Sequence, residues 1–252
     1  MKNSNPKRDR PYLFHIREGS NDIIQAVILA GGKGMRLRPL TCEIPKVMID
    51  INGRPFLQYV LELLHKKGIS NIVLLVSYLG EQIEKYFGDG KKFGLDITYS
   101  YEDPPLGTGG ALKKAERLLL PEFLLVNGDT YLDFDYKSLK NRFRDLDCKG
   151  LICVHANKDR KTVPNILLGE DKRVIRYDNT NPCVAGLIEV DAGAGIFRKE
   201  VLNLIPENVS VSFENEIYNK LIQEMELYGF PIENEFLDIG VFQRLNYARK
   251  IL

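Results

Sequence analysis

The sequence predicts an α/β fold with a mostly parallel, mixed sheet, helices on both of its faces and a small β-rich subdomain. Three observations support this prediction. Short apolar runs typical of buried strands alternate with stretches of helical periodicity along the first 160 residues or so. A glycine-rich loop directly follows the first of these runs. From about Pro164 onward, short β-type runs lie close together, so we expect a separate β-rich part.

The first half of the chain alternates strands and helices. It begins with a buried strand at Ala26–Leu29, because this run is apolar throughout. A short extended piece over 47–51 ends in a turn at Asn52-Gly53, and helical spacing of apolar residues follows until Gly68 ends the helix. Further strands are expected over 71–76, 97–101, 123–126 and 151–154, and helices over 56–64, 81–87, 109–120 and 136–146. This alternation is typical of a parallel sheet with helices on both faces.

The second half of the chain has a different texture. Short β-type runs lie close together over 166–168, 174–177, 185–190 and 194–197. Helical spacing returns over 214–225, and a last helix is expected over 242–251. At the other end, the first 22 residues are mostly polar and show no periodicity. We therefore expect an N-terminal extension over 1–23 and one domain over 24–252 that divides near residue 160.

Composition and charge argue against several classes of protein. The chain has 252 residues, 44% hydrophobic and 27% charged, as is ordinary for a globular protein. Its net charge of +1 gives no basic field for nucleic acid, and no apolar run approaches the ~20 residues needed to span a bilayer. Four scattered cysteines and three histidines argue against a zinc site. We therefore expect a cytoplasmic protein with reduced thiols, no nucleic-acid partner and no membrane segment.

A loop with three glycines in four positions follows the first strand. Gly31, Gly32 and Gly34 release the backbone from side-chain sterics, so the loop can turn N–H groups toward an anion. Cations lie within the loop or close after it, at Lys33, Arg36, Arg38 and Lys46. The loop matches neither the P-loop nor the dinucleotide-binding pattern. A plain turn is the alternative for the glycines alone, and the cations favour a polyphosphate site.

Two aspartates farther along the chain are candidate ligands for a metal ion. Asp129 follows the strand expected over 123–126, and ligands of open α/β sheets bind beyond the carboxyl ends of strands. A carboxylate beside a phosphate site suits Mg²⁺, which takes one or two carboxylates plus phosphate oxygens. A simple turn residue is the alternative for Asp129. Asp238, taken alone, is more typical of a helix cap.

Five segments of this chain occur in the order found in one enzyme family. They are Leu29-Ala-Gly-Gly-x-Gly-x-Arg-Leu37, Pro45-Lys46, Leu106-Gly-Thr-Gly-Gly110, Asn127-Gly-Asp129 and Phe236-Leu-Asp-Ile-Gly240. On these motifs the chain resembles the sugar-1-phosphate nucleotidyltransferases from about Gln25 to its C-terminus. Segments 104–111 and 127–133 look most like the D-glycero-D-manno-heptose 1-phosphate guanylyltransferase branch. The resemblance implies a Rossmann-like, nucleotide-binding core over about 24–160 and a sugar-binding part with the C-terminal helices over about 161–252.

The resemblance also implies a reaction and a set of site residues. A sugar 1-phosphate oxygen attacks the α-phosphorus of a nucleoside triphosphate, and pyrophosphate leaves. The implied catalytic residues are Arg36, Lys46 and Asp129, and the implied ligands of Mg²⁺ are Asp129 and Asp238. The implied nucleotide-binding residues are Leu29, Ala30, Gly31, Gly32, Gly34, Ser77, Tyr78, Leu106, Gly107, Thr108 and Gly109. The implied sugar-binding residues are Gly128, Asp191, Ala192 and Gly193.

Three departures from the family pattern leave the sugar open. Asp191 stands where members usually have Asn, Tyr177-Asp-Asn179 replaces a Glu-Lys pair, and Gly240-Val-Phe242 replaces Gly-Thr-Pro. Our leading hypothesis is transfer of GMP from GTP to a heptose 1-phosphate, for lipopolysaccharide or capsule biosynthesis. The alternative within the family is a thymidylyl-, uridylyl- or guanylyltransferase of glucose or mannose 1-phosphate. The alternative of another class is a non-catalytic nucleotide-sugar sensor, and formation of a homo-oligomer is left open.

Overall fold

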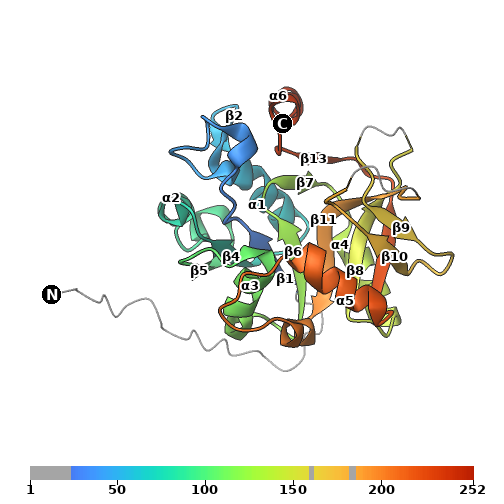
Figure 1. Ribbon diagram of the computed structural model, residues 1–252. Helices are drawn as coiled ribbons and strands as arrows, with labels where there is room; N and C mark the ends of the chain where they lie inside the picture. Colours follow the sequence, from blue (N-terminus) through green and yellow to red (C-terminus); the bar gives the residue numbers. More distant parts are fainter. Residues whose placement is uncertain (1–23, 159–161, 182–185) are drawn as a thin grey trace.

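The computed structural model describes residues 24–158, 162–181 and 186–252. A central sheet with helices on both faces makes up the body of the protein (Figure 1), so the predicted α/β fold with a mostly parallel mixed sheet is confirmed. Within the described ranges, no helix is long and apolar enough to cross a membrane. The extension predicted over 1–23 lies outside the described residues, and the division near residue 160 stays a prediction.

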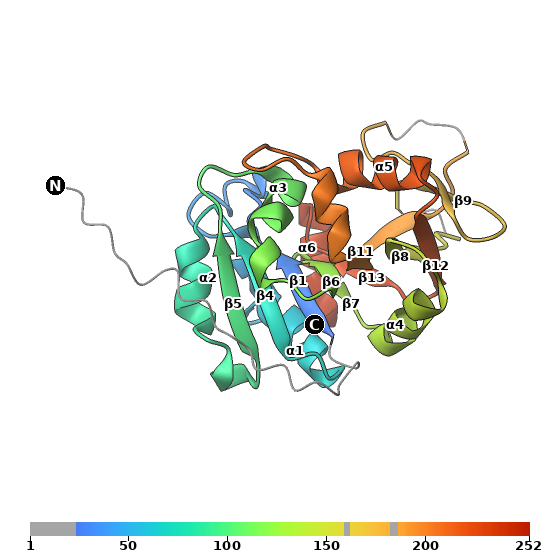
Figure 2. The same cartoon turned by 90° about the horizontal axis from the view of Figure 1, so that it is seen from below.

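Seven strands form the central sheet in the order β12-β8-β11-β6-β1-β4-β5 (Figure 2). They are β1 Gln25–Leu29, β4 Asn71–Val76, β5 Asp96–Tyr101, β6 Glu122–Asn127, β8 Gly150–His155, β11 Val190–Arg198 and β12 Leu227–Ile232. β1 is parallel to β4 and β6, β4 is parallel to β5, and β12 is parallel to β8. β11 runs antiparallel to its neighbours β6 and β8. The carboxyl ends of the other six strands therefore share one edge, where ligands of such sheets bind.

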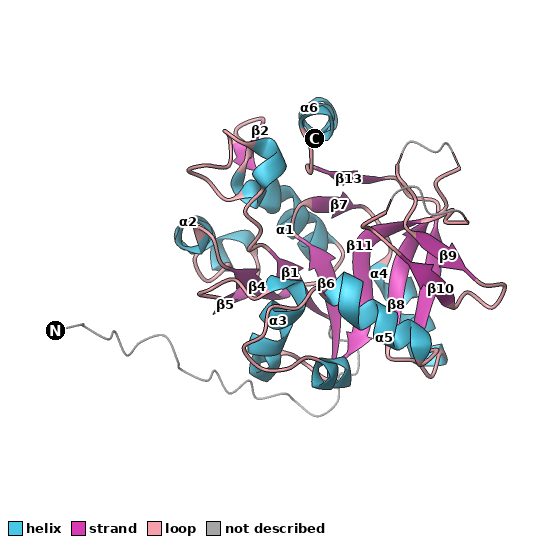
Figure 3. Cartoon of the chain, in the orientation of Figure 1, coloured by secondary structure: helices cyan, strands magenta, loops and turns pink. Residues whose placement is uncertain are grey.

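Helices cover both faces of this sheet (Figure 3). Their apolar side chains pack with those of the strands in two hydrophobic cores. The helices are α1 Phe56–Lys66, α2 Gly80–Phe87, α3 Gly107–Lys114, α4 Tyr136–Asp145, α5 Tyr218–Gln223 and α6 Phe242–Ile251. α1, α2, α4 and α6 pack in one core, with strand residues such as Ile28 and Leu74. α3 and α5 pack in the other, with Val27 and Leu125. Because alternate strand residues point to opposite faces, each apolar run of the sequence serves both cores.

In the described part of the chain, three two-stranded sheets lie outside the central one. They pair β2 Asp50–Ile51 with β3 Arg54–Pro55, β7 Thr130–Leu132 with β13 Phe236–Asp238, and β9 Ile166–Leu168 with β10 Val174–Tyr177. The β7–β13 pair joins segments far apart in the sequence and places Asp238 opposite Thr130. The Ile239 amide also donates to the Asp129 carbonyl at 3.1 Å. The two aspartates noted in the sequence are thereby brought close together.

In the first half of the chain, two elements differ in the structure from their predicted secondary structure. The helix predicted over 109–120 is α3, which ends at Lys114 and passes into a short 3₁₀ helix. The extended piece predicted over 47–51 is wrong in its first half, because Lys46–Met48 form a 3₁₀ turn. The Met48 amide closes this turn on the Pro45 carbonyl at 2.8 Å. The apolar pattern alone does not distinguish such a turn from a strand.

The second half contains strands that the sequence pattern does not separate correctly. The strand predicted over 194–197 is confirmed as part of β11, which is longer and has an irregular register after Asp191. The strand predicted over 185–190 is wrong over 186–188, because β11 begins at Val190, and residue 185 lies outside the described residues. β7 and β13 are too short to show a period, and they were not predicted. β12 was also missed, since Gly229 and Pro231 interrupt its apolar pattern.

Candidate active site

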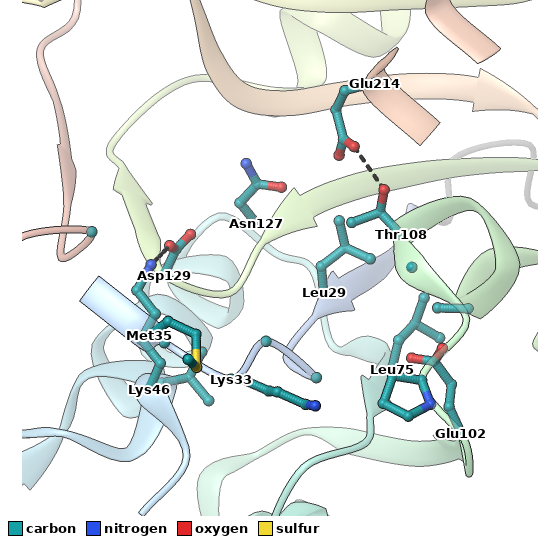
Figure 4. A pocket seen from close by; sticks show the side chains of 18 of the residues that line it. Leu29, Lys33, Met35, Lys46, Leu75, Glu102, Thr108, Asn127, Asp129 and Glu214 are labelled. Atoms are coloured by element: carbon teal, nitrogen blue, oxygen red, sulfur yellow. Dashed lines mark hydrogen bonds and ion pairs between the residues drawn. The ribbon is translucent and has the colours of Figure 1, made fainter. Parts of the chain in front are cut away.

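A pocket of about 540 Å³ opens over the carboxyl ends of β1, β4 and β6 (Figure 4). Leu29, Leu75 and Asn127 line it from these three strands. Its other lining residues are Gly31, Gly32, Lys33, Gly34, Met35, Arg36, Lys46, Val47, Glu102, Pro105, Gly107, Thr108, Ala111, Asp129, Glu214 and Gly240. The pocket, called the main pocket below, thus lies where an open α/β sheet binds its ligands.

The glycine loop reaches the main pocket through its backbone. Gly34 has φ +59°, which favours glycine, and a Cβ added there would lie 2.8 Å from Thr41 Cγ2. Thr41 Oγ1 donates to the Gly34 carbonyl at 2.9 Å and fixes the turn. A Cβ added at Gly31 would lie 3.1 Å from Ser77 Cβ, whereas Gly32 has open space around it. Two of the three glycines therefore leave little or no room for a side chain.

Three of the cations noted in the sequence line the main pocket, namely Lys33, Arg36 and Lys46. Lys46 Nζ forms an ion pair with Asp129 Oδ2, and the two side chains are 13% and 28% exposed (Figure 4). Arg36 lies beside Gly240, since its Nη2 would be 3.4 Å from a Cβ added to that glycine. A polyphosphate bound in this pocket would meet positive charge from both the loop and Lys46.

Asp238 lies at the end of β13 and is held from two sides. Its Oδ1 accepts a hydrogen bond from the Gly240 amide at 2.8 Å, and its Oδ2 forms an ion pair with Arg244. Asp238 lines a second cavity of about 350 Å³ rather than the main pocket. Asp129 and Asp238 are thus close through their backbones, and each has a basic partner. The described residues contain no group of three or more His, Cys, Asp or Glu side chains placed to hold a metal ion.

Asp191 and Gly193 line a third, small cavity of about 10 Å³, together with Asn127 and Glu214. Asp191 Oδ1 accepts from the Gly193 amide at 2.8 Å. Burial raises the pKa of Asp191 to about 7; the hydrogen bond from Gly193 opposes this shift, and the nearby Glu214 carboxylate adds to it. Since Asn127 and Glu214 also line the main pocket, the predicted sugar-binding carboxylate borders the same site.

Several predicted site residues do not line the main pocket. Ala30 and Ala192 are core residues, and Leu106, Gly109 and Gly128 are also buried. Ser77 and Tyr78 follow β4, where their hydroxyls donate to the carbonyls of Glu102 and Cys42, at 3.2 and 2.6 Å. Their predicted contact with a nucleotide stays a prediction.

The sequence reasoning missed two carboxylates that line the main pocket. Glu102 is 8% exposed, and its Oε2 accepts from the Leu106 amide at 2.6 Å. Burial raises the pKa of Glu102, while the hydrogen bond from Leu106 and the charge of Lys114 lower it. Glu214 Oε2 accepts from Thr108 Oγ1 at 2.6 Å (Figure 4). For Glu102 a signal existed, because an acidic residue directly follows an expected strand and precedes a glycine-rich segment.

Comparison with known proteins agrees with this arrangement. The chain is similar to D-glycero-alpha-D-manno-heptose 1-phosphate guanylyltransferase of Aneurinibacillus thermoaerophilus, with 33% identity over 91% of this chain and 98% of that one. It is 34% identical to UTP--glucose-1-phosphate uridylyltransferase of Synechocystis sp., over 86% of this chain and 60% of that one. The crystal structure of HddC from Yersinia pseudotuberculosis complexed with GMP-PN has a TM-score of 0.75 and 28% identity, covering 90% of this chain and 99% of that one.

The family comparison covers the glycine loop, both aspartates and the C-terminal helix. Residues 25–251 match the protein family described as nucleotidyl transferase. This range is nearly the whole of the part that the structure describes. The resemblance noted in the sequence is therefore confirmed, and the chain belongs to the nucleotidyl transferase family.

Proposed function

We propose that this enzyme transfers GMP from GTP to a heptose 1-phosphate, giving a GDP-sugar and pyrophosphate. The observation that carries the proposal is the pairing of a cationic glycine loop with two adjoining aspartates at one edge of the sheet. A reaction between two anions needs this combination, because the enzyme must hold them together and stabilise the charge of the leaving group. A nucleotide-sugar sensor has no need of cations directed at a leaving group.

In this proposal, the glycine loop and its cations hold the triphosphate in the main pocket. Backbone N–H groups of Gly31, Gly32 and Gly34 bind phosphate oxygens, as in other anion-binding loops. Arg36 neutralises the pyrophosphate as it leaves, and Lys46 holds a phosphate oxygen at the reacting centre. Lys46 is well placed for this because Asp129 already orients its ammonium group in the pocket.

A divalent ion fits the two aspartates in number and kind. Asp129 and Asp238 offer two carboxylates at neighbouring backbone positions, and Mg²⁺ takes one or two carboxylates plus phosphate oxygens. Both carboxylates have a basic partner in the protein alone, so we expect the ion to arrive with the triphosphate. Bound there, Mg²⁺ would act as a Lewis acid toward phosphate oxygens.

We assign selection of guanine to Glu102. The carboxylate lines the main pocket beside Gly31, and its Oε1 would be 3.4 Å from a Cβ added to that glycine. One oxygen is used by the Leu106 amide, so the other is available as an acceptor. Guanine offers N1–H and N2–H donors on its pairing edge, whereas uracil and thymine offer one N–H. The guanine-nucleotide names of the heptose relative and of the HddC complex support this choice.

The acceptor sugar is assigned to two regions, the second cavity with Asp238 and the small cavity with Asp191 that borders the main pocket. Hydroxyl-rich ligands need many hydrogen-bonding groups, and these regions offer carboxylates and the Thr162 hydroxyl. The heptose relative, aligned over 91% of the chain, supports a heptose. We place the reaction in the cytoplasm, in the synthesis of surface polysaccharide; the free thiols of Cys42, Cys148 and Cys153 agree with a reducing compartment.

A matrix of five nucleoside triphosphates against hexose and heptose 1-phosphates, read by pyrophosphate release with Mg²⁺, tests the proposal. We expect the highest kcat/KM for GTP with a heptose 1-phosphate. A higher value for UTP or dTTP with glucose 1-phosphate would replace our choice with the alternative in the family, as the uridylyltransferase relative suggests. Binding of nucleotide in thermal-shift measurements without release from any pair would favour the sensor.

A further inference from the structure

Arg244 joins three segments around the second cavity. Its Nη1 forms an ion pair with Asp238 Oδ2, and its Nη2 donates to Thr162 Oγ1 at 2.9 Å. Its Cζ lies 5.9 Å from the centre of the Phe236 ring. Among the described residues that line this cavity, Arg244 is the one Lys or Arg side chain. A permanently charged group therefore faces a cavity that directly adjoins Asp238.

The position of Arg244 on its helix is electrostatically unusual. Leu245 and Ala248 are fully buried, so α6 is anchored and the place of Arg244 is fixed. Arg244 is the third residue of α6, where the helix dipole is positive and disfavours a cation. No side chain of the described residues caps this helix end, and the first N–H groups of a helix have no partner within the helix, so they can also meet an anion. Because a cation is unfavourable at the N-terminal end of a helix, we expect Arg244 to be at this position in order to bind an anion.

The basic side chains near Asp129 and Asp238 lie in two places, the main pocket and the second cavity. Arg36 and Lys46 line the main pocket, where the triphosphate brings its own negative charge. The acceptor brings a second phosphate, which must approach the same aspartates. On that side, among the described residues that line the second cavity, Arg244 is the one Lys or Arg, and it is paired with Asp238. Its guanidinium has five donors, of which the two described contacts engage two.

We propose that Arg244 binds the phosphate of the sugar 1-phosphate, exchanging its contact with Asp238 for the phosphate while Thr162 keeps hold of the guanidinium. This assignment rests on the proposed function. In the free protein, the ion pair with Asp238 holds the Arg244 guanidinium in position. When the acceptor arrives, its phosphate takes the place of the carboxylate, because guanidinium binds both groups through the same fork of N–H donors.

The test compares R244A and R244K with R249A. Arg249 lies on the same helix, and toward the described residues its side chain donates one long hydrogen bond of 3.4 Å, to the Asp50 carbonyl. R249A thus removes the same charge outside the site. KM for sugar 1-phosphate and KM for GTP are measured separately by pyrophosphate release. Binding of Mn²⁺ with GTP is followed by electron paramagnetic resonance, because a residue that merely positions Asp238 would change metal binding instead.

We expect R244A to raise KM for the sugar 1-phosphate about 10- to 100-fold, as for loss of a hydrogen bond between charged groups. KM for GTP should stay unchanged, and the Mn²⁺ complex should be no weaker, because loss of Arg244 removes a partner that competes for Asp238. R244K should raise KM for the sugar 1-phosphate less than R244A does, because lysine keeps the charge but not the fork of donors. R249A should match the native enzyme. If R244A does not fold, R244Q is judged by the same KM values.

An unchanged acceptor KM in folded R244A or R244Q overturns the assignment, as does a weaker Mn²⁺ complex with no change in acceptor KM. These results leave the proposed function intact, because native turnover continues. Failure of the native enzyme to release pyrophosphate from any substrate pair contradicts the proposed function, and the role of Arg244 fails with it.

Discussion

In the proposed site, the cationic loop assigned to the triphosphate comes from one stretch of chain, whereas the groups assigned to the acceptor come from segments far apart. The glycine loop, Arg36 and Lys46 follow one another directly after β1. Asp191, Asp238 and Arg244 come from β11, β13 and α6, and pairing of β13 with β7 is needed to bring Asp238 beside Asp129. Phosphate binding needs a local loop at a strand end, while binding of a particular sugar needs side chains gathered from several elements.

The two sides also differ in the charged groups that line them. On the nucleotide side, loop backbone and lysine offer positive charge, and Asp129 is the partner of Lys46. On the acceptor side, Asp191 and Glu214 border one small cavity, where burial and their mutual repulsion raise the pKa of Asp191. The nucleotide side therefore suits a polyanion, and the acceptor side suits a neutral polyol next to a phosphate.

The largest expected effect is on turnover, when the ion pair at the centre of the site is broken. K46A and D129A should each lower kcat about 10²- to 10³-fold, because each removes an electrostatic contact at the reacting phosphates. D129A also leaves the largely buried Lys46 ammonium without its partner. D133A is the matched control: Asp133 follows β7, pairs with Lys67 and is 54% exposed. Pyrophosphate release at saturating substrates measures the effect. Near-native kcat in both variants would contradict the assignment of Lys46 and Asp129 to the reacting phosphates.

A smaller effect is expected on base selection, which belongs to the nucleotide side alone. E102Q should lower kcat/KM for GTP about 10- to 100-fold, since the amide has one acceptor oxygen and no charge, whereas the carboxylate can accept from both the Leu106 amide and guanine. The ratio of UTP to GTP use should rise, while KM for the sugar 1-phosphate should not change. D103N, at the exposed neighbouring residue, controls for the lost charge. Equal losses with GTP and UTP would mean that Glu102 supports the loop without reading the base.

How far the sequence predicts the structure follows the same division. The runs at 71–76 and 123–126 predict β4 and β6 well, because strands buried on both faces are apolar throughout. The glycine loop is visible because its cations and glycines are contiguous. β7 and β13 have three residues each, so no period can reveal them, and without their pairing Asp238 resembles a helix cap. The site on the acceptor side therefore depends on contacts that the sequence pattern does not encode locally.

The smallest expected effect is on stability and concerns Asp191 on the acceptor side. Its pKa in the folded protein is about 7, against an ordinary value of 3.8. Between these values the folded protein keeps a proton that the unfolded chain has lost. The contribution of Asp191 to stability is therefore fully present at low pH and declines until the pH has risen through about 7. D191N should remove this decline and unfold with a free energy about 1 kcal/mol less dependent on pH between 6 and 8.

Urea unfolding of native protein and D191N at several pH values measures this difference, and the exposed D171N, from the turn between β9 and β10, controls for the change of charge. The comparison uses the difference between variants because the other carboxylates titrate in both. If D191N and the native protein keep the same pH dependence, Asp191 is charged throughout and the acceptor side carries more negative charge than the geometry implies. An amino group on the sugar would then suit this small cavity better than a hydroxyl, since an ionised Asp191 favours a cationic partner.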